Sequence, residues 1–85
     1  MNDEQLGRLA QIASEWKKDF DAMGGLGMPD YLKFESVTDF SMMLQDAILK
    51  VELGFFVSEA MEVIELLGDK MMTHDDLKRV KELMQ

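Results

Sequence analysis

Hydrophobic residues in the first quarter of the chain recur at alternating spacings of three and four. This spacing places them on one face of a helix, so it predicts an amphipathic helix over residues 3–23. Asn2 is the expected N-cap, with Gln5 as its capping-box partner, and Gly24 and Gly25 are expected to end the helix. The predicted buried stripe consists of Leu6, Leu9, Ala13, Trp16, Phe20 and Met23.

Residues 24–30 contain three glycines and the only proline of the chain. A stretch of this length is too short for a linker between domains, so it is read as a loop between helices. Pro29 can begin a helical turn, because its fixed φ suits the first helical position. We therefore expect a short helical turn through Tyr31, Leu32 and Phe34.

Two further helices are predicted within residues 38–67. Ser36 is the expected cap of the first, with Asp39 in the box position. The apolar stripe changes phase at Gly54, which predicts a break there. The alternative is one helix of about 30 residues, roughly 45 Å long, which would bury its stripe only by dimerising. The inward positions are expected to be Phe40, Leu44, Ala47, Ile48 and Val51, followed by Phe56, Ala60, Val63, Ile64 and Leu67.

The last helix has a clear start signal. Thr73 is the expected cap and Asp76 its box partner, and the preceding helix is expected to end at Gly68 as a C′ glycine. Leu77, Val80 and Met84 are the expected inward positions. Since no segment alternates with the period of a strand, the fold class is predicted to be all-α. We expect a small bundle or orthogonal array of three to four helices, with residues 1–85 forming a single domain.

Composition narrows the function classes. The chain has a net charge of −8 and no cysteine, which excludes disulfide scaffolds, zinc–thiolate sites and thiol nucleophiles. No apolar run is long enough for a membrane helix, and no basic cluster is present to bind nucleic acid directly. The acidic, polar start lacks the pattern of a secretory signal, so a cytoplasmic location is expected.

Residues that carry chemistry are sparse. His74 is the only histidine, and no nucleophile-elbow, zinc-protease or phosphate-loop motif accompanies it. The glycines at 24, 25 and 27 follow no strand and are read as a turn. We therefore expect a protein that is not an enzyme and that uses no cofactor.

Residues 19–30 bear some likeness to a calcium-binding loop. Asp19, Asp21 and Asp30 occupy its first, third and twelfth positions, and Gly24 occupies the sixth. Met23 at the fifth position offers no oxygen ligand, however. A capped helix followed by an ordinary loop is the expected structure, and a calcium-responsive module is the alternative.

Two adjacent aromatic residues, Phe55 and Phe56, cannot both point into one core from a helix. We expect an exposed apolar patch that includes this pair and serves as an interface. Methionines at 42–43 and 71–72 pose the same problem, and they either fill gaps in the core or add to such a patch. The expected rim of the patch is acidic and consists of Glu52, Glu59, Glu62 and Glu65.

These features together predict a protein–protein interaction module. It would act as a small adaptor, inhibitor or modulator of a larger partner with a basic surface, and the profile also fits a phage or mobile-element product. One alternative is an acidic mimic of nucleic acid that inhibits a DNA- or RNA-binding protein. Another is a homodimer through Leu9, Trp16 and Phe20, if the first stripe is not used within the chain's own core.

Overall fold

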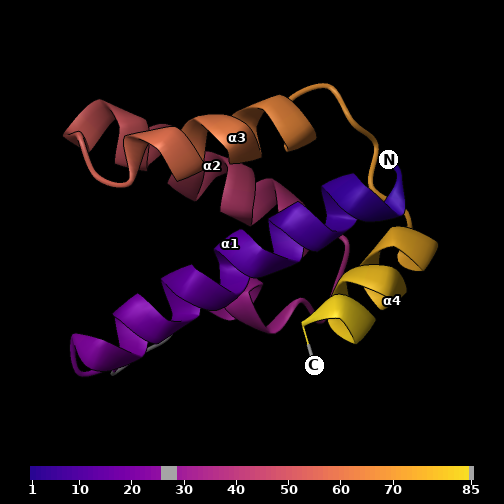
Figure 1. Ribbon diagram of the computed structural model, residues 1–85, viewed down its shortest axis with the longest axis horizontal. Coiled ribbons are helices and arrows are strands. Elements are labelled where there is room, and N and C mark those ends of the chain that lie inside the picture. Colours follow the sequence, from indigo (N-terminus) through magenta and orange to yellow (C-terminus); the bar gives the residue numbers. More distant parts are fainter. Residues whose placement is uncertain (26–28, 85) are drawn as a thin grey trace.

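Four α-helices and one 3-10 helical turn make up the protein in a computed structural model, which describes residues 1–25 and 29–84 (Figure 1). No strand occurs in these ranges, so the predicted all-α fold with up to four helices is confirmed. No helix in them is both long and apolar enough to cross a membrane. The elements are α1 (Asp3–Ala22), η1 (Asp30–Lys33), α2 (Thr38–Leu53), α3 (Val57–Leu67) and α4 (His74–Leu83).

Two helices begin with the capping boxes that the sequence predicts. The Asn2 side chain accepts a hydrogen bond from the Gln5 backbone N–H at 2.9 Å, and the Gln5 side chain accepts one from the Asn2 N–H at 3.1 Å. Thr73 and Asp76 make the same reciprocal pair at the start of α4. Each box gives partners to donors that the first turn of a helix leaves unpaired.

The predicted cap at the start of α2 is wrong in its detail. The helix begins at Thr38, one residue after a Val37 N-cap that provides no side-chain bond. Asp39 instead turns back into the preceding loop, where its carboxylate accepts the backbone N–H groups of Glu35 at 2.6 Å and Ser36 at 3.1 Å. The Ser36 hydroxyl donates to the same carboxylate, so it does not cap the helix. This buried Asp39 therefore organises the loop.

The predicted break at Gly54 is confirmed, so α2 and α3 are separate helices. Gly54 has a φ of 77°, and the Phe55 N–H donates to the Lys50 carbonyl at 2.8 Å, which closes the end of α2. Gly68 also ends its helix as predicted, but not as a left-handed C′ residue, because its φ is −56°. A side-chain carbon at Gly68 would lie 2.6 Å from the Ile64 carbonyl oxygen, so close packing explains that glycine.

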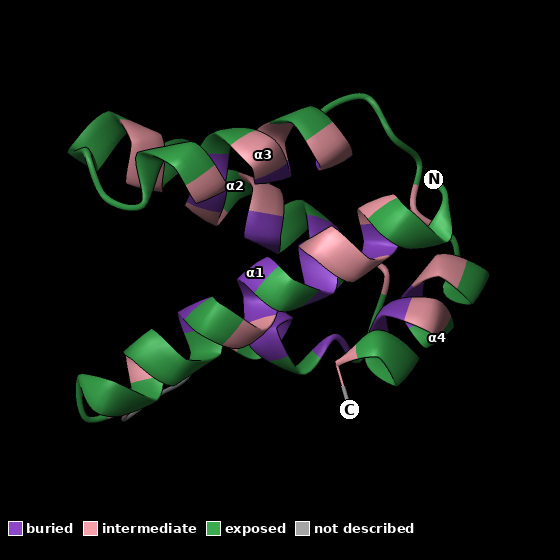
Figure 2. Cartoon of the chain, viewed as in Figure 1, coloured by how far each residue is buried: buried purple, intermediate pink, exposed green. Residues whose placement is uncertain are grey.

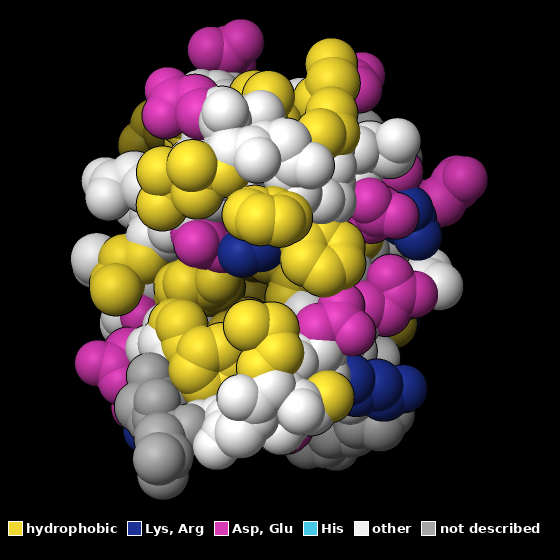
Figure 3. All heavy atoms as spheres, turned by 90° about the vertical axis from the view of Figure 1, so that its left-hand side faces the viewer, with side chains coloured by type: hydrophobic (Ala, Val, Ile, Leu, Met, Phe, Trp, Pro, Cys, Tyr) yellow, Lys and Arg dark blue, Asp and Glu magenta, His cyan; other side chains and the backbone are white. Residues whose placement is uncertain are grey.

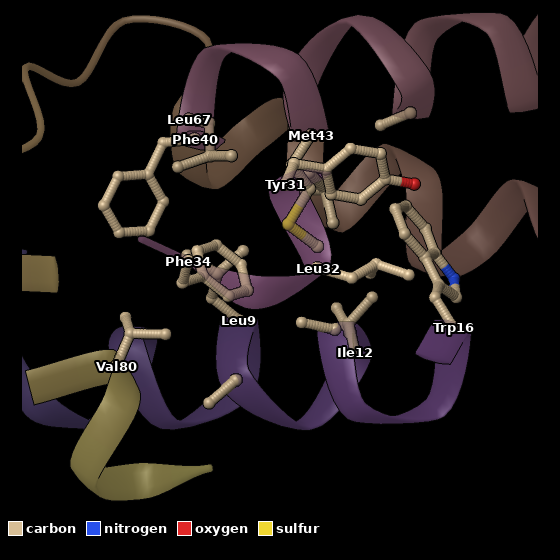
Figure 4. Packing of buried hydrophobic residues seen from close by; sticks show 14 of the residues in the cluster. Leu9, Ile12, Trp16, Tyr31, Leu32, Phe34, Phe40, Met43, Leu67 and Val80 are labelled. Carbon is tan, nitrogen blue, oxygen red and sulfur yellow. The ribbon is translucent and has the colours of Figure 1, made fainter. Parts of the chain in front are cut away.

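The core lies between α1 and the α2–α3 hairpin, with η1 wedged between α1 and α2 and α4 packed on α1 (Figures 1 and 2). Phe34 of the η1 segment is fully buried, and its ring lies 5.2 Å from that of Phe40 on α2 (Figure 4). The buried apolar residues are Leu6, Leu9, Ala10, Ile12, Ala13, Trp16, Tyr31, Leu32, Phe34, Phe40, Met43, Ala47, Ala60, Val63, Leu67, Leu77 and Val80.

Three residues of the predicted inward stripes are exposed. Met23 is 84% exposed because the last turn of α1 extends beyond the core. Ile48 is exposed on α2. Met43, which was not among the predicted inward positions, is fully buried on the same helix. Phe56 is not inside α3 but is its N-cap, and it is half exposed.

Candidate binding groove

Phe55 and Phe56 form the tip of the α2–α3 hairpin. Their side chains are 60% and 45% exposed, as expected for an adjacent pair that one core cannot bury. Phe56 also has a left-handed backbone conformation, with a φ of 48°. This conformation costs a residue with a side chain about 1–2 kcal/mol. The turn therefore holds a large, half-exposed aromatic residue in a strained conformation, and strained residues cluster at functional sites.

These two phenylalanines border a groove of about 490 Å³. The groove lies between the end of α1 and the hairpin, and hydrophobic side chains surround its opening (Figure 3). Of the eleven large hydrophobic residues exposed in the described chain, five line this groove. The lining residues are Trp16, Asp19, Phe20, Met23, Pro29, Tyr31, Leu32, Asp46, Leu49, Lys50, Leu53, Phe55 and Phe56.

A short network of polar groups lies among the groove-lining residues. The Tyr31 hydroxyl donates to the Asp46 carboxylate, and the Lys50 ammonium forms an ion pair with the same carboxylate at 2.7 Å. Burial, followed by the hydrogen bond to Asp46 and the charge of Asp46, raises the pKa of Tyr31 well above its ordinary value. The network thus places a neutral phenol and a balanced ion pair in a largely apolar groove.

Trp16 forms the inner wall of the groove, where the core ends. The Lys50 ammonium lies 4.8 Å from the centre of its ring, within the range of a cation–π contact. The indole N–H is buried and has no hydrogen-bond partner among the described residues. Figure 4 shows this nitrogen at the end of the indole directed away from Ile12 and Leu32. Trp16 is therefore both a core residue and part of the groove.

The predicted acidic rim is less uniform than the sequence indicates. Arg8 of α1 holds Glu62 with two hydrogen bonds, at 2.6 and 2.8 Å. The hydrogen bonding and charge of Arg8 lower the pKa of the Glu62 carboxyl. Glu62 thus belongs to the α1–α3 contact. Glu52 and Glu65 remain exposed, and Glu59 is partly buried, but none of the four predicted rim residues lines the groove.

The carboxylates of the calcium-loop alternative do not gather in the described part of the chain. Asp19 and Asp21 lie in the last turn of α1 and Asp30 begins η1, while residues 26–28 of that segment are outside the described residues. Within the described ranges, no group of three or more acidic or histidine side chains is placed to hold a metal ion.

The stripe on α1 is used mainly within the chain's own core. Leu9 and Trp16 are buried there, so these two residues of the homodimer alternative present almost no surface to a second copy. Phe20 is only partly buried, and it lines the groove. The groove is therefore the part of the α1 stripe that the core leaves open.

Most residues of the groove lie outside the interface predicted from the sequence. Leu49 and Leu53 are four residues apart on α2 and lie on one helix face, a signal that the main α2 stripe obscured. Asp46 and Lys50 have the spacing of a helical ion pair, which was also available from the sequence. The hydrogen bond from Tyr31 to Asp46 depends on how η1 packs on α2. No local sequence pattern reveals that packing.

No protein-family model, curated protein or solved structure matches this chain.

Proposed function

We propose that this protein is a non-enzymatic binding module, an adaptor, inhibitor or modulator that docks on a larger protein through the groove. The observation that carries the proposal is the groove itself, where five exposed large hydrophobic side chains surround one concave site. On soluble proteins, exposed apolar side chains that gather around one concave site often mark a binding surface. Apolar and aromatic anchors supply most of the affinity in such interfaces.

The strain at Phe56 supports the same proposal. Glycine would take the left-handed conformation at this position without steric strain, yet a phenylalanine occupies it and remains half exposed. Within the chain, the partial burial of Phe56 offsets the backbone strain only in part. A partner that covers the exposed part of this aromatic ring would add the remaining burial.

The acidic mimic of nucleic acid has less support. Its strongest feature was the row of glutamates on α3, and Arg8 pairs with the central one, Glu62. We therefore place the interface at the groove, with the remaining acidic surface steering a basic partner toward it.

The proposal is tested by comparing two matched variants in affinity capture. Leu53→Ser removes an exposed groove side chain, and Met71→Ser removes a side chain that is 93% exposed and lies outside the groove. Both proteins, and the wild type, are immobilised and incubated with extract of the source cells. We expect a protein retained at high salt by the wild type and by Met71→Ser but lost by Leu53→Ser. Equal retention by all three would refute the groove as the interface.

A further inference from the structure

The groove has a helix on each side. Trp16, Phe20 and Met23 follow one another at spacings of four and three along α1, so they occupy one face of that helix. Leu49 and Leu53 likewise share a face of α2. The same α1 stripe, further toward its start, packs against the other helices of the protein. The groove thus continues the helix-packing surface of the core beyond the point where the core ends.

From this arrangement, and resting on the function proposed above, we infer that the occupant of the groove is an amphipathic α-helix of the partner, apolar on the face that enters and basic beside it. A helix laid there would contact α1 on one side and the α2–α3 hairpin on the other. It would complete a layer of helices in the way that bundles do. A helix of about 15 residues is about 22 Å long, which is comparable with the two shorter extents of the molecule, 23 and 20 Å.

The charges at the groove favour a basic helix. Asp46 is balanced by Lys50, whereas Asp19 is exposed and has no ion-pair partner among the described residues. Successive residues of a helix are about 100° apart, so the neighbouring Lys18 lies on the side of α1 opposite Trp16, away from the groove. The net charge of the chain is −8, which adds a long-range attraction for lysine and arginine.

The same charge argues against a second copy as the occupant, because two chains of −8 repel each other. A small molecule in the groove would leave the outer side chains uncovered, since Leu53 and Phe55 are each 60% exposed. A helix can cover both the groove and these outer residues. A helix is therefore the occupant that accounts for the whole apolar surface.

A peptide selection tests the inference without knowledge of the partner. A displayed library of random peptides of about 15 residues is selected on the folded wild-type protein and depleted on Leu53→Ser. We expect enriched sequences with apolar residues at i, i+3 or i+4, and i+7, and with an excess of lysine and arginine. Enrichment of proline-rich, strand-like or acidic sequences would overturn the inference, as would no enrichment at all.

An enriched peptide without tryptophan is then titrated against the protein. Trp16 is the only tryptophan of the chain and lines the groove, so its fluorescence reports occupancy. We expect saturable one-to-one binding that is at least about tenfold weaker for Leu53→Ser and unchanged for Met71→Ser. A scrambled peptide of the same composition should not bind. Equal binding of the scrambled peptide, or of Leu53→Ser, would contradict the inference.

The results separate this inference from the proposed function. If affinity capture depends on Leu53 but the selected peptides are not basic helices, the groove is an interface and the helical occupant is wrong. If capture does not depend on Leu53, the proposed function fails, whatever the peptides do. Sedimentation of the wild type tests whether a second copy of the chain occupies the groove. A stable dimer that excludes the peptide would assign the groove to that second copy and overturn the inference.

Discussion

Phe34 and Phe56 share a left-handed backbone conformation, with φ values of 47° and 48°, but they lie in opposite surroundings. Phe34 is fully buried against Phe40, whereas Phe56 is half exposed at the tip of a hairpin. Burial of a phenylalanine stabilises a fold by more than this backbone conformation costs. Full burial therefore offsets the backbone strain at Phe34. Partial burial offsets only part of the same strain at Phe56.

Glycine substitutions at these two positions should have different effects on stability. Phe34→Gly should lower the free energy of unfolding by about 2 kcal/mol or more, because the cavity outweighs the relief of backbone strain. Phe56→Gly should change it by less than about 1 kcal/mol, since strain relief and lost burial nearly cancel. Urea unfolding followed by circular dichroism measures both. A large loss of stability in Phe56→Gly would show that this residue serves the fold.

Two other glycine positions give a second matched pair. An alanine side chain at Gly7, within α1, would meet only a Leu83 methyl group at 4.0 Å. Gly7→Ala should therefore raise the free energy of unfolding by about 0.5–1 kcal/mol through helix propensity. Gly54→Ala should lower it by about 1 kcal/mol, because its φ of 77° is strained for alanine. Thermal unfolding of the two variants measures these changes. If both substitutions raised the stability, or both lowered it, the left-handed conformation of Gly54 in the hairpin turn would be contradicted.

The phenol of Tyr31 should make the fold sensitive to alkali. Its pKa is raised in the folded protein by burial and by Asp46, so the unfolded chain releases this proton at a lower pH. The contribution of Tyr31 to stability is thus complete below about pH 10 and is lost as the pH rises above that value. Tyr31 is the only tyrosine, so ultraviolet absorbance can follow its ionisation directly.

Asp46→Asn provides the control for Tyr31. Removal of the carboxylate charge should lower the Tyr31 pKa relative to the wild type, while burial keeps it above the ordinary value. Ionisation of Tyr31 at its ordinary pKa in the folded wild type would show that the phenol is not held by Asp46.

The pairing of Arg8 with Glu62 predicts a pH dependence of the opposite sign. The pKa of Glu62 is lowered in the folded state, so its contribution to stability is present at neutral pH and is lost as the pH falls through that pKa. Arg8→Gln should raise the Glu62 pKa toward its ordinary value, as measured by NMR titration. It should destabilise the protein at neutral pH and have little effect below the pKa of Glu62. An unchanged Glu62 pKa would rule out the α1–α3 ion pair in solution.

Local signals in the sequence were sufficient to predict most helix boundaries. Both capping boxes depend on residues three positions apart, and the phase change at Gly54 is a local pattern as well. The start of α2 was predicted less well, because Asp39 bonds to the loop before it and not in a reciprocal box with Ser36. A serine–aspartate spacing alone does not distinguish these two arrangements.

The groove could be predicted only in part. Periodicity identified the face of α1 that carries Trp16, Phe20 and Met23, but it does not show how far the opposing helices extend along that face. That extent depends on the tertiary packing of η1 and the α2–α3 hairpin. For the same reason, the pairing of Glu62 with Arg8, 54 residues away, was not visible in the charge pattern of α3.

In-cell photo-crosslinking tests the central claim most directly. The photoreactive amino acid p-benzoylphenylalanine is placed at position 55, beside the groove, or at position 71, outside it. We predict a discrete covalent adduct to one other protein from position 55 and none of that mass from position 71. The same adduct from both positions, an adduct from position 71 alone, or only a dimer of this chain would contradict docking of a partner protein at the groove.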